Sequence, residues 1–246
     1  MFARRQFGLL AGALALGTLL AAAPVAAQTA PDAAPSPVVV ELYTSQGCSA
    51  CPPADRMLAD MIGHDEILPL ALHVDYWDYL GWKDGLADPM FTRRQKAYAR
   101  AKGSRMIYTP QMVIDGRHFI KGAHPGEVAE QIAMARMQPR QVRLSLSAEG
   151  DGRFRLEAEP LPGLVAGPMQ VTLVHYMPLK TVEILRGENA GSRIDYANVV
   201  TFWKPVAEWD GRRTLQIDLR AEQDRPGAVL LQRAGFGAIE AAARLP

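Results

Sequence analysis

Cys48 and Cys51 are the side chains with the clearest chemistry, and they are the only cysteines of the 246-residue chain. Only Ser49 and Ala50 separate them, so the two thiols can close a small disulfide, and a thiolate can attack another disulfide. A helix that begins near Pro52 would place the pair at its N-terminus, where free N–H groups and the helix dipole lower a thiol pKa. The pattern favours thiol–disulfide exchange, in which Cys48 attacks and Cys51 resolves the mixed disulfide.

Two other uses of the cysteine pair stay open. Two thiolates and a histidine suit a soft ion such as Cu(I), and His73 is the first candidate for the third ligand. No histidine forms a spaced metal motif with the cysteines, so the sequence predicts neither a metal site nor a cofactor. A purely structural disulfide is the other alternative, although so short a loop gives little entropic stabilisation.

An aromatic loop from Asp75 to Asp84 provides the candidate substrate-binding residues. Tyr76, Trp77 and Trp82 could form a wall beside the thiols that selects the substrate. The alternative is that these side chains cover an interface between two domains.

The elements that must position these residues follow from the pattern of apolar side chains. Strands and helices alternate, and a hairpin and a final helix follow. Strands are predicted at 38–43, 67–74, 111–114 and 118–120, and helices at 52–62, 89–102 and 125–137. The order β-α-β-α-β-β-α predicts an α/β layer fold of the thioredoxin-like type over residues 38–140.

The sequence pattern changes near Arg140. From there on, short segments of alternating apolar and polar residues are separated by Gly, Pro and Asp. Such segments are typical of antiparallel strands. They lie at 141–147, 153–158, 169–176, 181–185, 199–203, 214–219 and 228–232. Residues 141–246 are therefore predicted to form a small antiparallel β-sandwich-like domain.

The N-terminus has the pattern of a secretory signal peptide over residues 1–27. Arg4 and Arg5 precede a small apolar run, and Ala27 ends a segment that signal peptidase can cleave. Residues 28–37 contain three prolines and predict a flexible tether. We expect a periplasmic or secreted bacterial protein without a membrane anchor after cleavage, and both the Sec and the twin-arginine route stay open.

Charge is balanced along the chain, with 27 Lys and Arg against 26 Asp and Glu. Two of the basic residues and none of the acidic ones lie in the signal peptide, which leaves a net charge of −1 with neutral histidine. Nucleic acid binding usually requires a strongly basic surface. The composition therefore disfavours nucleic acid as a partner.

Several long motifs resemble those of the secreted bacterial thioredoxin-like proteins grouped as domain-of-unknown-function family 1223. They are TSQGCSACPPAD (44–55), HVDYWDYLGWKD (73–84) and YTPQMVIDG (108–116). The similarity continues through 186–191 and 198–200 and so covers essentially the whole mature chain. It implies a thioredoxin-like fold and a redox function, without a known substrate.

The resemblance to thioredoxin-like proteins also assigns roles to three residues. Thr109-Pro110 matches the cis-proline that faces the cysteine pair, where it would present the Thr109 backbone to an extended substrate strand. The alternative is an ordinary trans proline that opens an edge strand. Glu41, within the first strand, matches to within one residue the buried acid that accepts a proton from the resolving cysteine. The alternative is that Glu41 points outward or caps a neighbouring backbone.

Together these features predict an exported thiol–disulfide oxidoreductase that acts on protein or small-molecule thiols and disulfides. The soft-metal-binding protein is the alternative function. A third possibility is an interaction protein in which residues 141–246 bind a partner, although no motif in that segment names one.

Overall fold

The computed structural model describes Met1, residues 36–222 and residues 224–246. The predicted signal peptide beyond Met1, and the predicted tether up to residue 35, lie outside the described residues. No helix in the described part of the chain is both long enough and apolar enough to cross a membrane.

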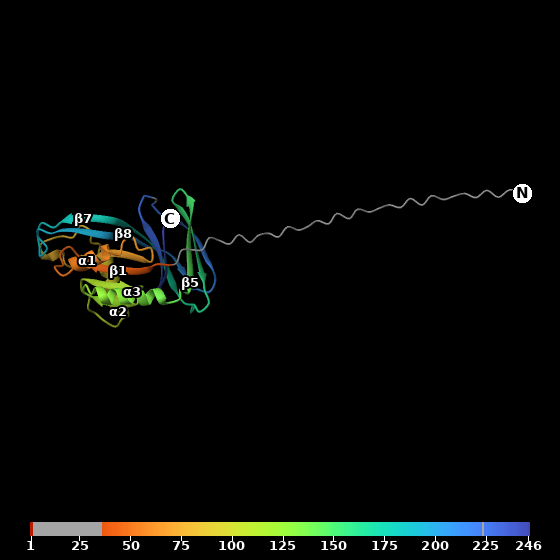
Figure 1. The fold of residues 1–246 in the computed structure, drawn as a ribbon, viewed down its shortest axis with the longest axis horizontal. Coiled ribbons are helices and arrows are strands. Elements are labelled where there is room, and N and C mark those ends of the chain that lie inside the picture. Colours follow the sequence, from red (N-terminus) through yellow and green to blue (C-terminus); the bar gives the residue numbers. More distant parts are fainter. Residues whose placement is uncertain (2–35, 223) are drawn as a thin grey trace. The chain divides into compact units, whose positions relative to one another are not determined.

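The fold is a mixed α/β fold with one large and one small sheet (Figure 1). In chain order the elements are β1 (Val38–Thr44), α1 (Pro52–Ala59), β2 (Ile67–His73), a 3-10 turn (Asp78–Leu80), α2 (Pro89–Ala101), β3 (Gln111–Ile114), β4 (His118–Lys121), α3 (Pro125–Met137), β5 (Val142–Gly150), β6 (Arg153–Pro160), β7 (Met169–Glu183), β8 (Arg193–Trp209), β9 (Leu215–Arg220), β10 (Gly227–Arg233) and β11 (Ile239–Arg244). The elements from β1 to α3 follow the predicted order, with the 3-10 turn added before α2.

The large sheet has the strand order β11-β10-β7-β8-β2-β1-β3-β4. β1 and β2 are parallel over their whole length, and β2 meets β8 in parallel at a single pair, Ala71 and Val199. β3 and β4 run antiparallel and join through a tight turn in which Asp115 and Gly116 both have positive φ, as the Asp-Gly pair predicts.

β1 is buried along all seven residues because both faces of the sheet are covered here. Val40 and Leu42 face the core formed with α1 and α3. Val39 and Tyr43 face the opposite core, to which α2 contributes. A strand covered on both faces is apolar at almost every position, which explains the continuous run that predicted it.

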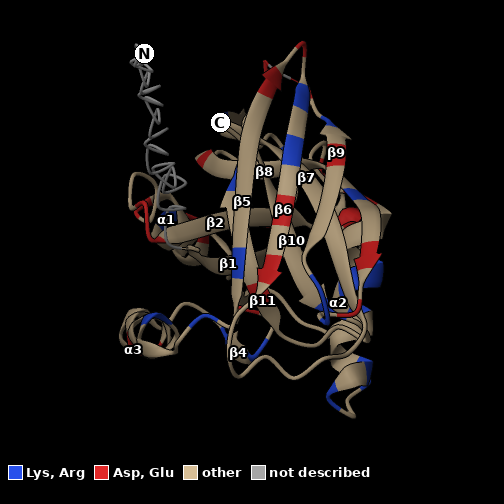
Figure 2. Ribbon diagram, turned by 90° about the vertical axis from the view of Figure 1, so that its right-hand side faces the viewer, with Lys and Arg blue, Asp and Glu red and all other residues tan. Residues whose placement is uncertain are grey.

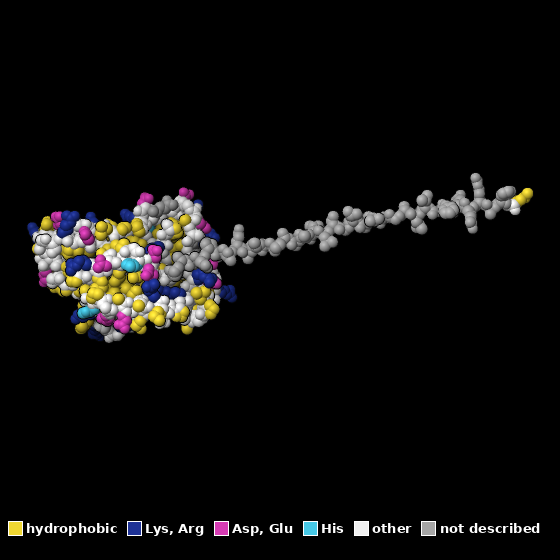
Figure 3. Space-filling view, in the orientation of Figure 1, with side chains coloured by type: hydrophobic (Ala, Val, Ile, Leu, Met, Phe, Trp, Pro, Cys, Tyr) yellow, Lys and Arg dark blue, Asp and Glu magenta, His cyan; other side chains and the backbone are white. Residues whose placement is uncertain are grey.

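The small sheet has the order β5-β6-β9 and is antiparallel throughout. Leu156 and Leu219 pack against Val229 and Leu231 of the large sheet. Figure 2 shows charged positions along β5, β6 and β9, in keeping with a sheet that buries one face and exposes the other. Basic and acidic side chains are interspersed on the face drawn in Figure 3, where hydrophobic side chains gather near α1 and α3.

The predicted boundary near Arg140 does not separate two sheets. The segment after it supplies β7, β8, β10 and β11, which are four of the eight strands of the large sheet. β8 lies beside β2, and Tyr196 and Val199 belong to the same core as α1. The reason is that β2 is apolar on both faces and its outer edge needs a partner strand. The β-rich segment thus completes the first sheet besides forming the second.

Two strand predictions need correction. The segments predicted at 169–176 and 181–185 are one strand, β7, which continues through Pro178. Proline is tolerated there because β10 pairs with β7 only as far as His175, so Pro178 lies where β7 has one open edge. β11 was not predicted at all, because its run Ala241-Ala242-Ala243 has low strand propensity.

Candidate functional site

The cysteine pair lies in the turn between β1 and α1. Cys48 and Cys51 form a disulfide, with their sulfur atoms 2.17 Å apart. Cys51 is the N-cap residue of α1, and Pro52 occupies the first turn, as predicted. Cys48 is 4% exposed and Cys51 is fully buried, so Cys48 is the more accessible of the two.

A buried carboxyl group lies one helical turn after Cys51. Asp55 follows Cys51 by four residues, and its N–H donates to the Cys51 carbonyl at 3.1 Å, so the two residues share one face of α1. The Thr44 hydroxyl donates to Asp55 Oδ1 at 2.7 Å. Asp55 Oδ2 is buried without a hydrogen-bond partner among the described residues. Burial raises the pKa of Asp55 to about 7, so this carboxyl group can gain or lose a proton near neutral pH.

A second acid, Asp84, is bound to His73 at the end of β2. His73 Nδ1 lies 2.8 Å from Asp84 Oδ2, and both side chains are fully buried. Asp84 also accepts hydrogen bonds from the N–H groups of Gln46 and Leu86. Although burial raises the pKa of Asp84, the His73 hydrogen bond, the His73 charge and these N–H groups together hold it below its usual value.

Asp55, His73 and Asp84 belong to one buried polar cluster. Tyr196 packs edge-on against His73, with ring centroids 4.7 Å apart, and burial together with the charges of Asp55 and Asp84 raises its pKa. His73 is the largest nearby charge that lowers the pKa of Asp55. His73 Nε2 is buried and, within the described residues, unpartnered. Two open hydrogen-bonding atoms, one on Asp55 and one on His73, therefore lie within this cluster beneath the cysteine turn.

The tip of the β7–β8 hairpin holds the cysteine turn in place. Asn189 Nδ2 donates to the Gln46 carbonyl at 2.8 Å and to the Cys48 carbonyl at 3.0 Å. Trp82 Nε1 donates to Gln46 Oε1 at 2.7 Å, and a Cβ atom at Gly187 would lie only 3.2 Å from Trp82. The backbone before Cys48 is thus fixed by side chains from two distant segments.

The predicted proline lies at the same end of the sheet as the cysteines. The Thr109–Pro110 peptide bond is cis, as predicted. Gln111 pairs with Tyr43, so Pro110 sits beside the end of β1 from which the cysteine turn departs. Trp77 connects the two, because its Nε1 donates to Thr109 Oγ1 at 2.7 Å and its Cβ would lie 3.1 Å from a Cβ at Gly47.

The three predicted substrate-binding aromatics take different places. Trp77 and Trp82 contact the cysteine turn, as described above. Tyr76 packs against the core on the α2 side, and burial raises its pKa to about 12. Tyr79, stacked 6.4 Å from Trp77, is the aromatic of this loop that projects into solvent.

Glu41 does not join the cysteines. It lies between Val40 and Leu42, whose side chains face α1, so Glu41 points to the opposite face of the sheet. There it forms an ion pair with Arg94 of α2 at 2.7 Å and accepts a hydrogen bond from Tyr98 at 2.7 Å. Successive side chains of a strand point to opposite faces of the sheet. The one-residue offset of Glu41 from the buried acid of thioredoxin-like proteins therefore places its side chain on the face away from the cysteines.

Asp55 is the residue of this site that the sequence did not single out, whereas the sequence predicts that Glu188 and Asn189, in a turn at 187–191, can reach the cysteines. Asp55 could have been found, because four-residue spacing from Cys51 on a predicted helix places both on one face. Asn189 does reach the cysteine turn, although its contacts with Gln46 and Cys48 span more than 140 residues and no local pattern specifies them. Among the described residues, no cluster of three or more His, Cys, Asp and Glu side chains is arranged to hold a metal ion.

A model of the family of proteins of unknown function DUF1223 matches residues 39–232. The chain belongs to this family. A crystal structure of a protein from Agrobacterium tumefaciens, solved by a structural genomics consortium, is 33% identical to this DUF1223 chain. The similarity covers 88% of this chain and 96% of that one, with a TM-score of 0.72.

A second solved structure, HBP35 of Porphyromonas gingivalis, is similar in fold to this DUF1223 protein. It shares 13% identity, over 86% of this chain and 75% of its own, with a TM-score of 0.61. No curated protein matches the chain.

Proposed function

We propose that this DUF1223 protein catalyses thiol–disulfide exchange through Cys48 and Cys51. The observation that carries the proposal is the order of burial at the start of α1. Both cysteines are buried, Cys48 with 4% of its surface exposed and Cys51 at the N-cap with none, and the buried Asp55 carboxyl group follows one turn later. Exchange through a mixed disulfide needs an attacking thiol that is less buried than the resolving thiol, and a nearby proton acceptor.

The reaction would proceed in two balanced steps. The Cys48 thiolate attacks one sulfur of a substrate disulfide, so that a Cys48–substrate disulfide forms and one substrate thiolate leaves. Cys51 then loses its proton and attacks the Cys48 sulfur, which closes the Cys48–Cys51 disulfide and releases the second substrate thiolate. The substrate gains two electrons and the protein loses two. The reverse sequence oxidises a dithiol, and the redox partner sets the direction.

Asp55 would accept the Cys51 proton. Its pKa of about 7 lies close to neutral pH. A base whose pKa is near the working pH both accepts and returns protons readily. The Thr44 hydroxyl fixes one carboxyl oxygen and leaves Oδ2 open. His73, held by Asp84, would help to stabilise the ionised form of Asp55.

Two finer features belong to the same proposal. A thioredoxin-like fold is supported by the element order from β1 to α3 and by the position of Pro110 beside the end of β1 from which the cysteine turn departs. Export, with cleavage near Ala27, is supported by the sequence pattern alone. The soft-metal alternative has less support, since no three or more His, Cys, Asp and Glu side chains of the described residues are grouped to hold a metal ion.

Cysteine variants test the exchange itself. We expect Cys48→Ser to abolish turnover of a model disulfide, because no attacking thiolate remains. Cys51→Ser should instead accumulate the Cys48–substrate disulfide, detectable by mass spectrometry of the intact protein. Ser49→Ala, in the same exposed turn, is the matched control and should keep the wild-type rate. Unchanged turnover in Cys48→Ser would overturn the proposal.

The role of Asp55 is tested by the pH dependence of resolution. In wild type, the rate at which Cys51 resolves a preformed mixed disulfide should rise through pH ~7, as Asp55 ionises. Asp55→Asn should lose that inflection and slow the step by roughly 100-fold. Asp60 is an exposed acid at the end of the same helix, and Asp60→Asn should keep both the inflection and the wild-type rate of resolution. An unchanged profile in Asp55→Asn would exclude Asp55 as the acceptor while leaving exchange by the cysteines intact.

A further inference from the structure

A basic cleft lies at the far end of β1 from the cysteines. Asp115, in the β3–β4 turn, accepts a hydrogen bond from Val39 N at 2.8 Å, whereas the cysteine turn leaves β1 at Thr44. Five residue steps along the strand lead from Val39 to Thr44, about 16 Å at the usual rise per residue. The cleft has a volume of about 840 Å³, within the size range of small-molecule sites.

Positive charge exceeds negative charge in this cleft. Four basic side chains and two acidic side chains line it. They are Lys102, Arg117, Arg140 and Arg233, and Asp115 and Glu240. Charges of one sign concentrated in a concave, partly desolvated wall focus the field and attract an oppositely charged ligand.

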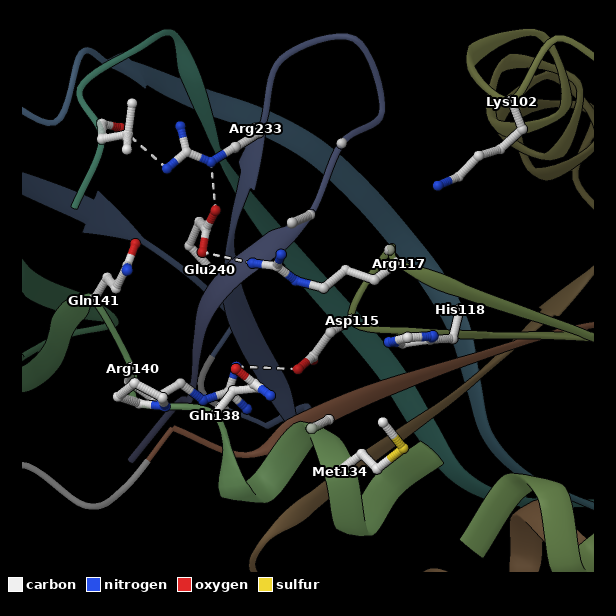
Figure 4. A pocket seen from close by; sticks show the side chains of 16 residues that line it. Lys102, Asp115, Arg117, His118, Met134, Gln138, Arg140, Gln141, Arg233 and Glu240 are labelled. Carbon is white, nitrogen blue, oxygen red and sulfur yellow. Dashed lines mark hydrogen bonds and ion pairs between the residues drawn. The ribbon is translucent and has the colours of Figure 1, made fainter. Parts of the chain in front are cut away.

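Both acids are already bound to arginines of the cleft. Glu240, whose side chain is 8% exposed, contacts Arg233 and lies 2.9 Å from Arg117 Nη2. Asp115, 4% exposed, lies 3.0 Å from Arg140 Nη1. These pairs neutralise the two carboxylates, and they also hold the guanidinium groups in fixed orientations (Figure 4).

Donors for a ligand remain on the other side of the cleft. Arg117 bonds to Glu240 through Nη2, while half of its side chain stays exposed and it forms no ion pair with another described acid. Lys102, at the C-cap of α2, has its ammonium group 5.0 Å from the Phe119 ring and forms no ion pair with a described residue. Figure 4 shows Lys102 extending toward the cleft, on the side where Arg117 and His118 also lie.

We infer that this cleft binds a small oxyanion, a phosphate or carboxylate group, between Lys102 and Arg117. An oriented guanidinium offers paired N–H donors that match two oxygens of such a group, and the lysine adds a point charge. The site is separate from the cysteine turn and goes beyond the proposed thiol chemistry. It would let the protein recognise an acidic small molecule at the opposite end of the sheet.

The test is titration of the full mature chain with inorganic phosphate and, separately, with citrate, followed by NMR chemical shifts at low salt. We expect saturable shifts around the β3–β4 turn with at least one of the two. If only phosphate or only citrate binds, the class of oxyanion is identified. If both bind, the cleft is a general oxyanion site. The double variant Lys102→Ala/Arg117→Gln should raise the dissociation constant at least ~tenfold. This double variant should still fold, because the ion pair between Glu240 and Arg233 is retained.

The matched control is Lys96→Ala/Arg93→Gln, which removes the same two charges from exposed positions of α2 outside the cleft. It should change the dissociation constant less than about twofold. No saturable binding by wild type, or an equal loss in the control, would overturn the inference. Both double variants should catalyse thiol exchange at the same rate. Failure of the oxyanion inference can therefore be distinguished from failure of the proposed function.

Discussion

Asp55 and Glu41 are two buried acids on opposite faces of the same sheet, and their partners give them opposite behaviour. Arg94 lies against Glu41, whereas the Asp55 carboxyl group has, among the described residues, the Thr44 hydroxyl as its one hydrogen-bond partner. A buried carboxyl group without a cation beside it favours its protonated form, and the pKa of Asp55 is raised in this way. The acid suited to proton transfer is therefore Asp55, and the acid suited to structural support is Glu41.

The raised pKa of Asp55 predicts a pH-dependent stability. Because the folded-state pKa of about 7 exceeds the unfolded value near 3.8, the native state binds more protons in between, and stability falls as pH rises from about 4 to 7. At pH 8 the neutral Asp55→Asn variant should be more stable than wild type, by an amount on the order of 4 kcal/mol at most. Urea unfolding at pH 4 and pH 8 measures this, and an equal difference at both values would contradict it.

Glu41→Gln should destabilise the protein without affecting the cysteines directly. The substitution leaves the Arg94 guanidinium, 9% exposed, without its counter-charge, which typically costs ~3–5 kcal/mol. Urea unfolding of the oxidised protein gives the loss. Glu130→Gln, an exposed acid on α3, serves as the control and should stay within ~0.5 kcal/mol of wild type. A loss no larger than that of the control would show that the ion pair is not structural.

At the scale of elements, the β7–β8 hairpin acts as a brace for the cysteine turn. Asn189→Ala removes both hydrogen bonds to the carbonyls of Gln46 and Cys48 and leaves those carbonyls buried. We expect a loss of ~1–3 kcal/mol in denaturant unfolding and faster reduction of the disulfide by dithiothreitol. Glu188→Ala, exposed in the same turn, should reproduce wild type in both measurements. Equal behaviour of the two variants would mean that the hairpin does not brace the turn.

Elements with strong local signals were predictable from the sequence, and elements set by distant pairing were not. β1, α1 and the Asp115-Gly116 turn have apolar runs, prolines or turn residues that act locally, and their positions are confirmed. The length of β7 and the existence of β11 depend on neighbouring strands rather than on local propensity. The same division holds in the site, where Cys48–Cys51 is local and Asn189 is not.

At the scale of the whole molecule, the first half of the chain is not expected to fold alone. Residues 36–140 without the rest would expose the edge of β2 that β8 covers, along with the core surface that Tyr196 and Val199 fill. A chain ending at residue 140 should be aggregated or lack dispersed amide signals in an NMR spectrum. Well-dispersed signals from that fragment would contradict this expectation.

The hydrogen bond from Asn189 to the Cys48 carbonyl joins residues 141 positions apart. A ribosome makes the cysteines long before it makes Asn189, so a growing chain carries both thiols without their brace for most of its synthesis. With no third cysteine, such a chain can form only one intramolecular disulfide, whatever the order of events. The cysteine turn is therefore synthesised well before the side chain that completes its hydrogen bonds.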